Sequence, residues 1–147
     1  MIKTDVQLVV AYIPDGKEQY LYAKSVSSIA PKASLTELRG LLHLLISKLG
    51  DYVGIELKSK KLGENLSVIR NSKLVNLSII DKLYDIKKAG DQAAHPEKFS
   101  HISLDEFTKL ANDSLQGFCH LIALIRLSVT GQSDNDFDFI TDETSKI

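Results

Sequence analysis

Leucines recur at three- and four-residue steps near the middle of the chain, and this spacing constrains the fold more than any other feature. Such steps place side chains on one face of an α-helix, which turns once in about 3.6 residues. The pattern predicts a helix over residues 34–49. Ser34 is the expected N-cap, Glu37 would complete a capping box, and Gly50 would end the helix. The apolar stripe consists of Leu35, Leu38, Leu42, Leu45 and Leu49.

A second apolar stripe near the C-terminus predicts the longest helix of the chain. Ser103 is followed three residues later by Glu106, which is the pattern of a capping box, and the helix would run to Gly131. Its length of about 27 residues corresponds to roughly 40 Å. The stripe consists of Phe107, Leu110, Ala111, Ser114, Phe118, Leu121, Ile122, Ile125 and Val129.

Two shorter periodic stretches predict helices over residues 63–69 and 74–88. Gly90 would weaken the second helix, and Pro96 would prevent its continuation past His95. Several helices joined by short connections, each with one apolar stripe, predict an all-α antiparallel bundle of four to five helices.

The N-terminal residues allow two interpretations. Residues 6–13 read as a strand or a dimer arm, and a β-hairpin turning at Asp15-Gly16 would extend this reading. Alternatively, residues 17–29 form a helix, which we prefer because of the resemblance described below. The expected organisation is an N-terminal arm or strand over 1–16, a helical domain over 17–131, and an acidic tail or linker over 132–147.

Composition places the chain among globular proteins. It has 147 residues, of which 44% are hydrophobic and 25% charged, and its single cysteine, Cys119, excludes an internal disulfide. We find no signal peptide and no apolar run long enough for a membrane span, so we expect a soluble, cytoplasmic protein. The histidines lack metal-ligand spacing and no glycine-rich phosphate loop occurs, so we expect neither a metal nor a cofactor.

Charge is distributed unevenly along the chain. Residues 132–147 contain five acids and one lysine, a net charge of −4, which leaves +3 on residues 1–131 of a chain whose total is −1. This tail reads either as a solvated terminus or linker, or as a strip that covers a basic surface of a partner. Lys58, Lys60 and Lys61 form a small basic patch, which is typical of a solvated loop and would also suit phosphate contacts.

Three segments, IAPKASLTELRGLLHLLISKLG, LGENL and LYDIKKAGDQAAHP, agree in order and spacing with a known pattern. They resemble the helical domains of the HEPN (higher eukaryote and prokaryote nucleotide-binding) superfamily. The most similar branch is an uncharacterised prokaryotic one that is also found attached to restriction-enzyme subunits. The resemblance covers about residues 18–128. The matching residues are Ala30, Pro31, Lys32, Ala33, Ser34, Arg39, Lys87, Gly90, Asp91, Ala93, His95 and Pro96.

The resemblance implies a candidate site. Active HEPN ribonucleases pair an arginine with a histidine across a homodimer and cleave RNA without metal. His95 would be the general acid or base here, and Lys87 stands where the motif has arginine. Lysine keeps the positive charge but loses the planar, two-pronged grip of a guanidinium. Asp91 replaces the motif asparagine and adds negative charge where a phosphate would approach.

The candidate catalytic residues are therefore His95 and Lys87, and the candidate binding residues are Arg39, Lys88, Asp91 and Gln92. Structural interpretations stand beside these roles. His95 would serve only to close a helix end, and Arg39 would be an ion-pair partner for Asp91 or Asp85. Lys87 and Asp91 are four residues apart, so they would pair with each other on a helix. Cys119 is expected to be a small core residue.

Three functions fit these observations. The leading hypothesis is a non-catalytic or weakly catalytic HEPN-like module that binds RNA, DNA or a protein, in a prokaryotic defence or regulatory setting that the resemblance alone suggests. The second is a metal-independent endoribonuclease that uses His95 and Lys87. The third is an antitoxin-like protein whose acidic tail masks a partner's basic site. The resemblance also implies a homodimer.

Overall fold

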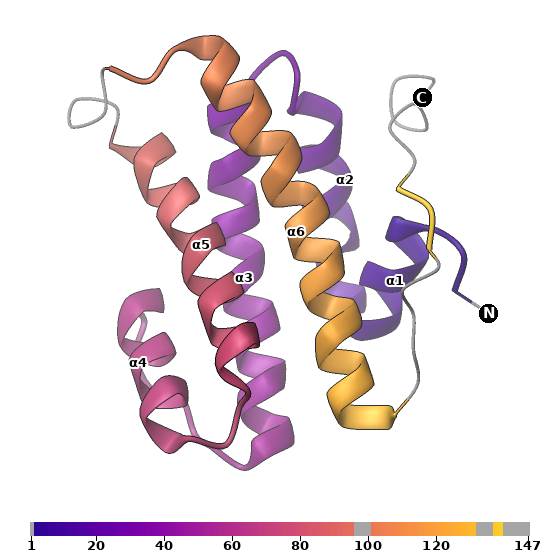
Figure 1. The fold of residues 1–147 in the computed structure, drawn as a ribbon, viewed down its shortest axis with the longest axis vertical. Helices are drawn as coiled ribbons and strands as arrows, with labels where there is room; N and C mark the ends of the chain where they lie inside the picture. The colour runs from indigo at the N-terminus through magenta and orange to yellow at the C-terminus, as the bar shows by residue number, and fades with distance from the viewer. Residues whose placement is uncertain (1, 96–100, 132–136, 140–147) are drawn as a thin grey trace.

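The computed structural model describes residues 2–95, 101–131 and 137–139. Over these residues the protein is an all-α bundle (Figure 1), as the periodicity predicted. The described ranges contain six α-helices and one short 3-10 turn, one helix more than the upper limit that we expected. The elements are α1 Asp5–Tyr12, η1 Pro14–Gly16, α2 Lys17–Val26, α3 Pro31–Val53, α4 Leu62–Ser72, α5 Leu77–Ala94 and α6 Leu104–Thr130.

Helix α3 is the centre of the bundle. It packs against α2, α5 and α6, and α5 and α6 also pack against each other. Figure 1 shows α3 behind α5 and α6, with α4 at one end of the bundle beside α5. The leucines of the predicted stripe on α3 are all buried, because this helix faces neighbours on several sides. The main core lies between these helices, and a smaller apolar cluster joins Leu35 of α3 to Ala89 of α5 and Phe107 of α6.

The strand interpretation of the N-terminal residues is wrong. Residues 5–12 form α1, which begins with a capping box between Thr4 and Gln7. Leu8 and Tyr12 are buried, and α1 packs against α2 and α6. A short apolar run fits a strand and a buried helix equally well, so tertiary packing decides between them. The preferred helix after Gly16 is confirmed as α2.

The predicted start of α3 is also wrong. The helix begins at Pro31, and Ala30 occupies the N-cap position. Proline is favoured in the first helical turn, because its missing N–H would have no partner there. Ser34 therefore lies inside the helix, and its hydroxyl donates a 2.6 Å hydrogen bond to the carbonyl of Ala23 in α2. The serine joins two helices instead of capping one.

Gly50 does not end α3. The helix continues to Val53, and Gly54 ends it in the left-handed conformation with φ 78° and ψ 27°. A side chain at position 50 would meet the chain that follows the helix, since an added Cβ would lie 3.0 Å from the carbonyl oxygen of Ile55. The glycine is thus explained by close packing rather than by a helix stop.

Both predicted ends of α5, at residues 74 and 88, differ from the structure, whereas both predicted ends of α6 are confirmed. Asn76 caps α5 with a side-chain hydrogen bond from the N–H of Ser78, and Gly90 is accommodated inside this helix, which continues to Ala94. The predicted capping box between Ser103 and Glu106 is confirmed at the start of α6. Gly131 ends α6 with φ 73°, as expected.

A charged cluster lies inside the core where α1, α2 and α6 meet. The ammonium of Lys24 is 2.9 Å from a carboxylate oxygen of Asp5, and both side chains are almost fully buried. The hydroxyl of Tyr20 donates to the same carboxylate and lies 3.1 Å from the sulfur of Cys119. Burial raises the pKa of the Cys119 thiol to about 12, so it stays protonated. The prediction that Cys119 is a core residue is confirmed.

The described part of the acidic tail lies along the N-terminus. Asp138 accepts a backbone hydrogen bond from Asp5 and donates one to the carbonyl of Lys3, at 3.0 and 2.7 Å. The Asp138 side chain is exposed. Residues 137–139 therefore pack on α1 rather than extending as a free linker, while the tail's other acids, Asp134, Asp136, Asp142 and Glu143, lie outside the described residues.

Candidate anion-binding groove

The crossing of α3 and α5 brings Arg39 close to the motif segment of α5. An added Cβ at Gly90 would lie 2.7 Å from Cβ of Arg39, which is closer than side-chain carbons approach one another. Helix α3 therefore approaches α5 closely at Gly90, and Arg39 is the residue that makes this approach. The absence of a side chain at position 90 lets Arg39 extend along α5 toward Asp91.

Asp91 is shared between two cations. Its two carboxylate oxygens accept hydrogen bonds from Nε of Arg39 at 2.7 Å and from Nζ of Lys87 at 2.6 Å. About a third or less of each of the three side chains is exposed. Burial opposes ionisation of Asp91, but the hydrogen bonds from Lys87 and Arg39 outweigh it and hold the pKa below its ordinary value. Both predicted pairings, Arg39 with Asp91 and Lys87 with Asp91, are confirmed.

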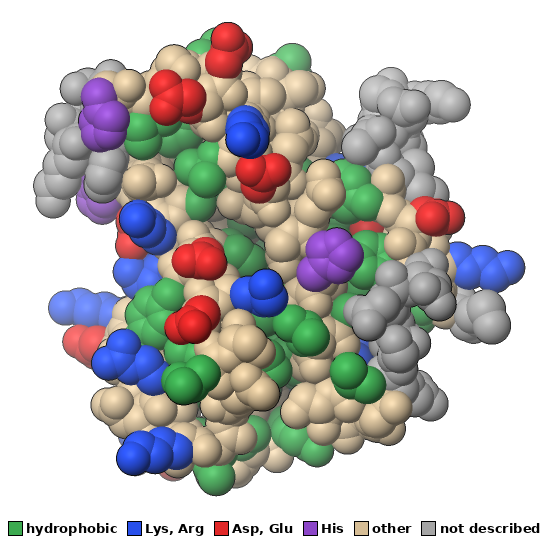
Figure 2. Space-filling view, in the orientation of Figure 1, with side chains coloured by type: hydrophobic (Ala, Val, Ile, Leu, Met, Phe, Trp, Pro, Cys, Tyr) green, Lys and Arg blue, Asp and Glu red, His purple; other side chains and the backbone are tan. Residues whose placement is uncertain are grey.

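These cations lie at one side of a surface groove between α3, the start of α4 and α5. The groove has a volume of about 680 Å³. Lys60 and Lys61 line it together with Arg39 and Lys87, and Glu64 is its one acidic lining residue. Figure 2 shows Lys and Arg side chains gathered on the side of the molecule where α4 lies, with fewer acids between them. The groove thus combines two lysines of the predicted loop patch with the motif residues.

Hydrogen bonds hold the lysine loop in place. The amide of Asn65 donates to the carbonyl of Ser59 at 2.9 Å, and the hydroxyl of Ser59 accepts from the N–H of Lys61 at 2.9 Å. Ser59 also donates to Glu64. This network fixes the backbone that carries Lys60 and Lys61 beside α4. The loop backbone is therefore held by its own side chains, and Lys60 and Lys61 line the groove with largely exposed side chains.

His43 is a groove residue that the sequence reasoning did not select. It lies one helical turn after Arg39 on α3 and lines the same groove. Burial lowers its pKa, and the neighbouring Arg39 charge lowers it further, so the imidazole is neutral at pH 7. The four-residue spacing from Arg39 was the available signal, because it places both side chains on one helix face.

The remaining candidates lie outside this groove. His95 is the C-cap of α5, where its backbone N–H donates to the carbonyl of Asp91 at 3.1 Å, and its side chain is exposed. Eight residues separate it from Lys87, about 12 Å along a helix axis. Lys88 is exposed, Gln92 is half-buried, and neither lines the groove. The structure therefore does not bring His95 and Lys87 together within one chain.

The described ranges contain no cluster of three or more His, Cys, Asp or Glu side chains suited to a metal ion. No helix in the same residues has the length and apolar character needed to cross a membrane. Comparisons of this chain with protein-family models, curated proteins and solved structures find no match. The resemblance to HEPN domains stays a prediction, and the geometry of the groove has to support a function by itself.

Proposed function

We propose that this protein is a nucleic-acid-binding module that contacts backbone phosphates in the groove between α3, α4 and α5. The observation that carries the proposal is the lining of the groove. Four permanent cations, Arg39, Lys60, Lys61 and Lys87, face one hollow with a single carboxylate, Glu64. This gathering occurs on a chain whose overall net charge is −1, so the positive charge is local.

The residue types suit phosphate recognition. Lysines act as point charges toward phosphate oxygens, and their contacts carry little sequence information. Arg39 keeps part of its guanidinium available, since the ion pair to Asp91 is made through Nε. Neutral His43 adds a ring nitrogen that donates or accepts a hydrogen bond. A strand that follows the groove would therefore be held by charge, with modest sequence preference.

Asp91 is expected to reduce this affinity. It already pairs with Lys87 and Arg39, so a phosphate must compete with a carboxylate for both cations. The same ion pair also holds the Lys87 ammonium away from a reacting phosphate, which disfavours a catalytic role for Lys87. The aspartate at position 91 would therefore change function relative to the HEPN motif. An asparagine there would leave both cations without a carboxylate partner.

The test is a binding assay with matched charge changes. A fluorescently labelled single-stranded RNA and a DNA of the same sequence are titrated with wild type, Lys60→Ala/Lys61→Ala, and Lys17→Ala/Lys109→Ala. Both double variants remove two exposed lysines. The groove variant should lose about tenfold in affinity and reduce the salt slope by roughly 1.4 for single strands, while the control keeps both. Equal losses in the two variants would refute the groove as the binding site.

The endoribonuclease hypothesis is tested with the same proteins. RNA cleavage is followed in EDTA for wild type and His95→Ala at matched fold and oligomeric state. Cleavage that disappears in the variant would establish His95 as catalytic, with Lys87 contributed by a second copy. The proposed binding role predicts bound, uncleaved RNA in both. A homodimer and a cytoplasmic location belong to this proposal through the HEPN resemblance, and light scattering after size exclusion tests the dimer.

A further inference from the structure

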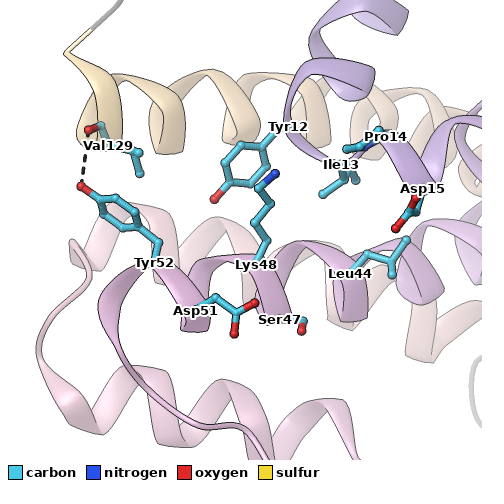
Figure 3. A pocket seen from close by; sticks show the side chains of 10 residues that line it. All are labelled: Tyr12, Ile13, Pro14, Asp15, Leu44, Ser47, Lys48, Asp51, Tyr52 and Val129. Atoms are coloured by element: carbon cyan, nitrogen blue, oxygen red, sulfur yellow. Dashed lines mark hydrogen bonds between the residues drawn. The ribbon is translucent and has the colours of Figure 1, made fainter.

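A second hollow of about 590 Å³ lies where the loop after α1 meets the C-terminal half of α3. It shares no lining residue with the groove. Figure 3 shows its walls: Ile13 and Leu44 supply apolar surface, and Tyr12, Lys48 and Asp51 supply polar groups. Apolar walls with a few converging polar groups are typical of small-molecule sites.

The hydroxyl of Tyr12 is the first sign of a ligand. Tyr12 is only 5% exposed, and its hydroxyl has no hydrogen-bond partner within the described part of the chain. In Figure 3 this hydroxyl points into the hollow, toward the side where Tyr52 and Asp51 lie. Burial raises the pKa of Tyr12 to about 12, so the group is a neutral hydroxyl that donates and accepts. A buried hydroxyl without a partner is unfavourable, and a ligand would supply one.

The charges around the hollow are the second sign. Asp15 and Asp51 both line it, and neither makes an ion pair or a side-chain hydrogen bond among residues 2–95, 101–131 and 137–139. Lys48 is the one cation of the lining, and its ammonium lies 5.1 Å above the ring centroid of Tyr12. The hollow thus has two carboxylates against one ammonium, and its aromatic face already holds a positive charge.

We propose that this hollow binds a small organic amine with an apolar body. The ammonium would donate to the Tyr12 hydroxyl and to the carboxylate of Asp51, while the body packs on Leu44. In the free protein Lys48 places a positive charge on the Tyr12 ring without an ion pair to either carboxylate, and its exposed, flexible side chain can withdraw when a ligand cation arrives. Lys48 therefore acts as an internal competitor of the ligand.

The role of Lys48 separates this ligand class from anionic ones. Replacing Lys48 by glutamine removes a positive charge, which strengthens binding of an amine and weakens binding of a carboxylate. The probe is 2-phenylethylamine, which is protonated at pH 7, compared with uncharged 2-phenylethanol and anionic phenylacetate. Binding is followed by chemical-shift changes of backbone amides in the ¹⁵N-labelled protein. The shifted amides should be those of residues lining the hollow.

The expected results are specific. Wild type binds the amine more tightly than the alcohol, and phenylacetate produces no shifts in the hollow. Lys48→Gln raises the amine affinity about threefold, Asp51→Asn lowers it about threefold, and Tyr12→Phe lowers it about fivefold. Lys109→Gln, the same change on an exposed part of α6, leaves it unchanged. If Tyr12→Phe fails to fold, the two exposed positions 48 and 51 still decide the question.

Three outcomes would overturn the proposal. The first is the absence of shifts in the hollow at millimolar amine. The second is equal affinity for the amine and the alcohol, which would make the hollow a merely apolar site. The third is weaker amine binding by Lys48→Gln, which would show that the Lys48 side chain supports the amine's site instead of competing with its ammonium.

Discussion

Asp91→Asn should loosen the fold slightly and strengthen nucleic-acid binding. The carboxylate of Asp91 accepts 2.6 and 2.7 Å hydrogen bonds from Lys87 and Arg39, and it is 31% exposed. Charge-assisted hydrogen bonds at this exposure are only partly screened by water, so the substitution should lower the free energy of unfolding by about 1 to 2 kcal/mol. It also releases two cations into the groove.

The gain in binding follows from those two cations. If each contacts one phosphate, the slope of log affinity against log salt becomes steeper by about 1.4 for a single strand, and affinity rises roughly 3- to 10-fold. Fluorescence anisotropy over a series of salt concentrations measures both quantities. Asp81→Asn, the same charge change at an exposed position of α5, is the matched control. Unchanged slope and affinity in Asp91→Asn would refute the reasoning that Asp91 competes with phosphate.

The pH dependence of stability checks the same pairing. The pKa of Asp91 is held below its ordinary value of 3.8 in the folded protein. A carboxyl with a lowered folded pKa stabilises the fold above its unfolded pKa and loses this contribution as pH falls through the folded value. Urea unfolding should therefore separate wild type from Asp91→Asn at pH 7, and the difference should shrink as the pH falls below about 3.8 and disappear below the folded pKa of Asp91. A difference in the free energy of unfolding that persists at low pH would mean that the substitution acts through packing.

Three further predictions test the packing. Gly90→Ala should lower the free energy of unfolding because the new Cβ meets Arg39 Cβ at 2.7 Å, whereas Gly117→Ala in α6 meets nothing within 4 Å. The two variants should differ by about 2 kcal/mol, with Gly117→Ala the more stable, and equal thermal midpoints would contradict the close approach. Asp5→Ala should destabilise by about 3 to 5 kcal/mol in denaturant unfolding, because it removes one partner of the buried pair with Lys24. Asp5→Leu/Lys24→Met should recover most of that loss, and no recovery would show that the pair is not the cause. Ser34→Ala should cost about 1 kcal/mol through its lost bond to the Ala23 carbonyl, and an unchanged thermal midpoint would count against that bond.

Much of the bundle could be predicted because its signals are local. The stripe from Leu35 to Leu49 and the capping box of Ser103 each follow from residues within a few turns of one another. The wrong predictions concern features that are determined by packing between segments far apart in the sequence. Residues 5–12 are helical because Leu8 and Tyr12 pack against other helices. Position 50 requires glycine because the backbone of Ile55, which follows α3, passes close to it. No periodicity reports such contacts.

The candidate groove also combines contacts that the sequence predicts with contacts that it does not. The pair Lys87–Asp91 follows from helical spacing, and Arg39–Asp91 follows once the two helices are assumed to touch. The meeting of Lys60 and Lys61 with Arg39 depends on where α4 packs, which the sequence does not encode locally. His95 was predicted as a catalytic residue from a sequence motif. A motif gives the order of residues along the chain, but it does not show which of them lie close together in the fold. The structure places it at a helix end instead.

The most direct measurement of the central claim is lysine footprinting by mass spectrometry. Exposed lysines are acetylated under limiting conditions with and without bound single-stranded RNA at low salt. We expect strong protection of Lys60 and Lys61, which are exposed and line the groove, and unchanged labelling of Lys17 and Lys109, which are exposed and lie elsewhere. Protection confined to lysines outside the groove, or none at a saturating RNA concentration, would contradict the account.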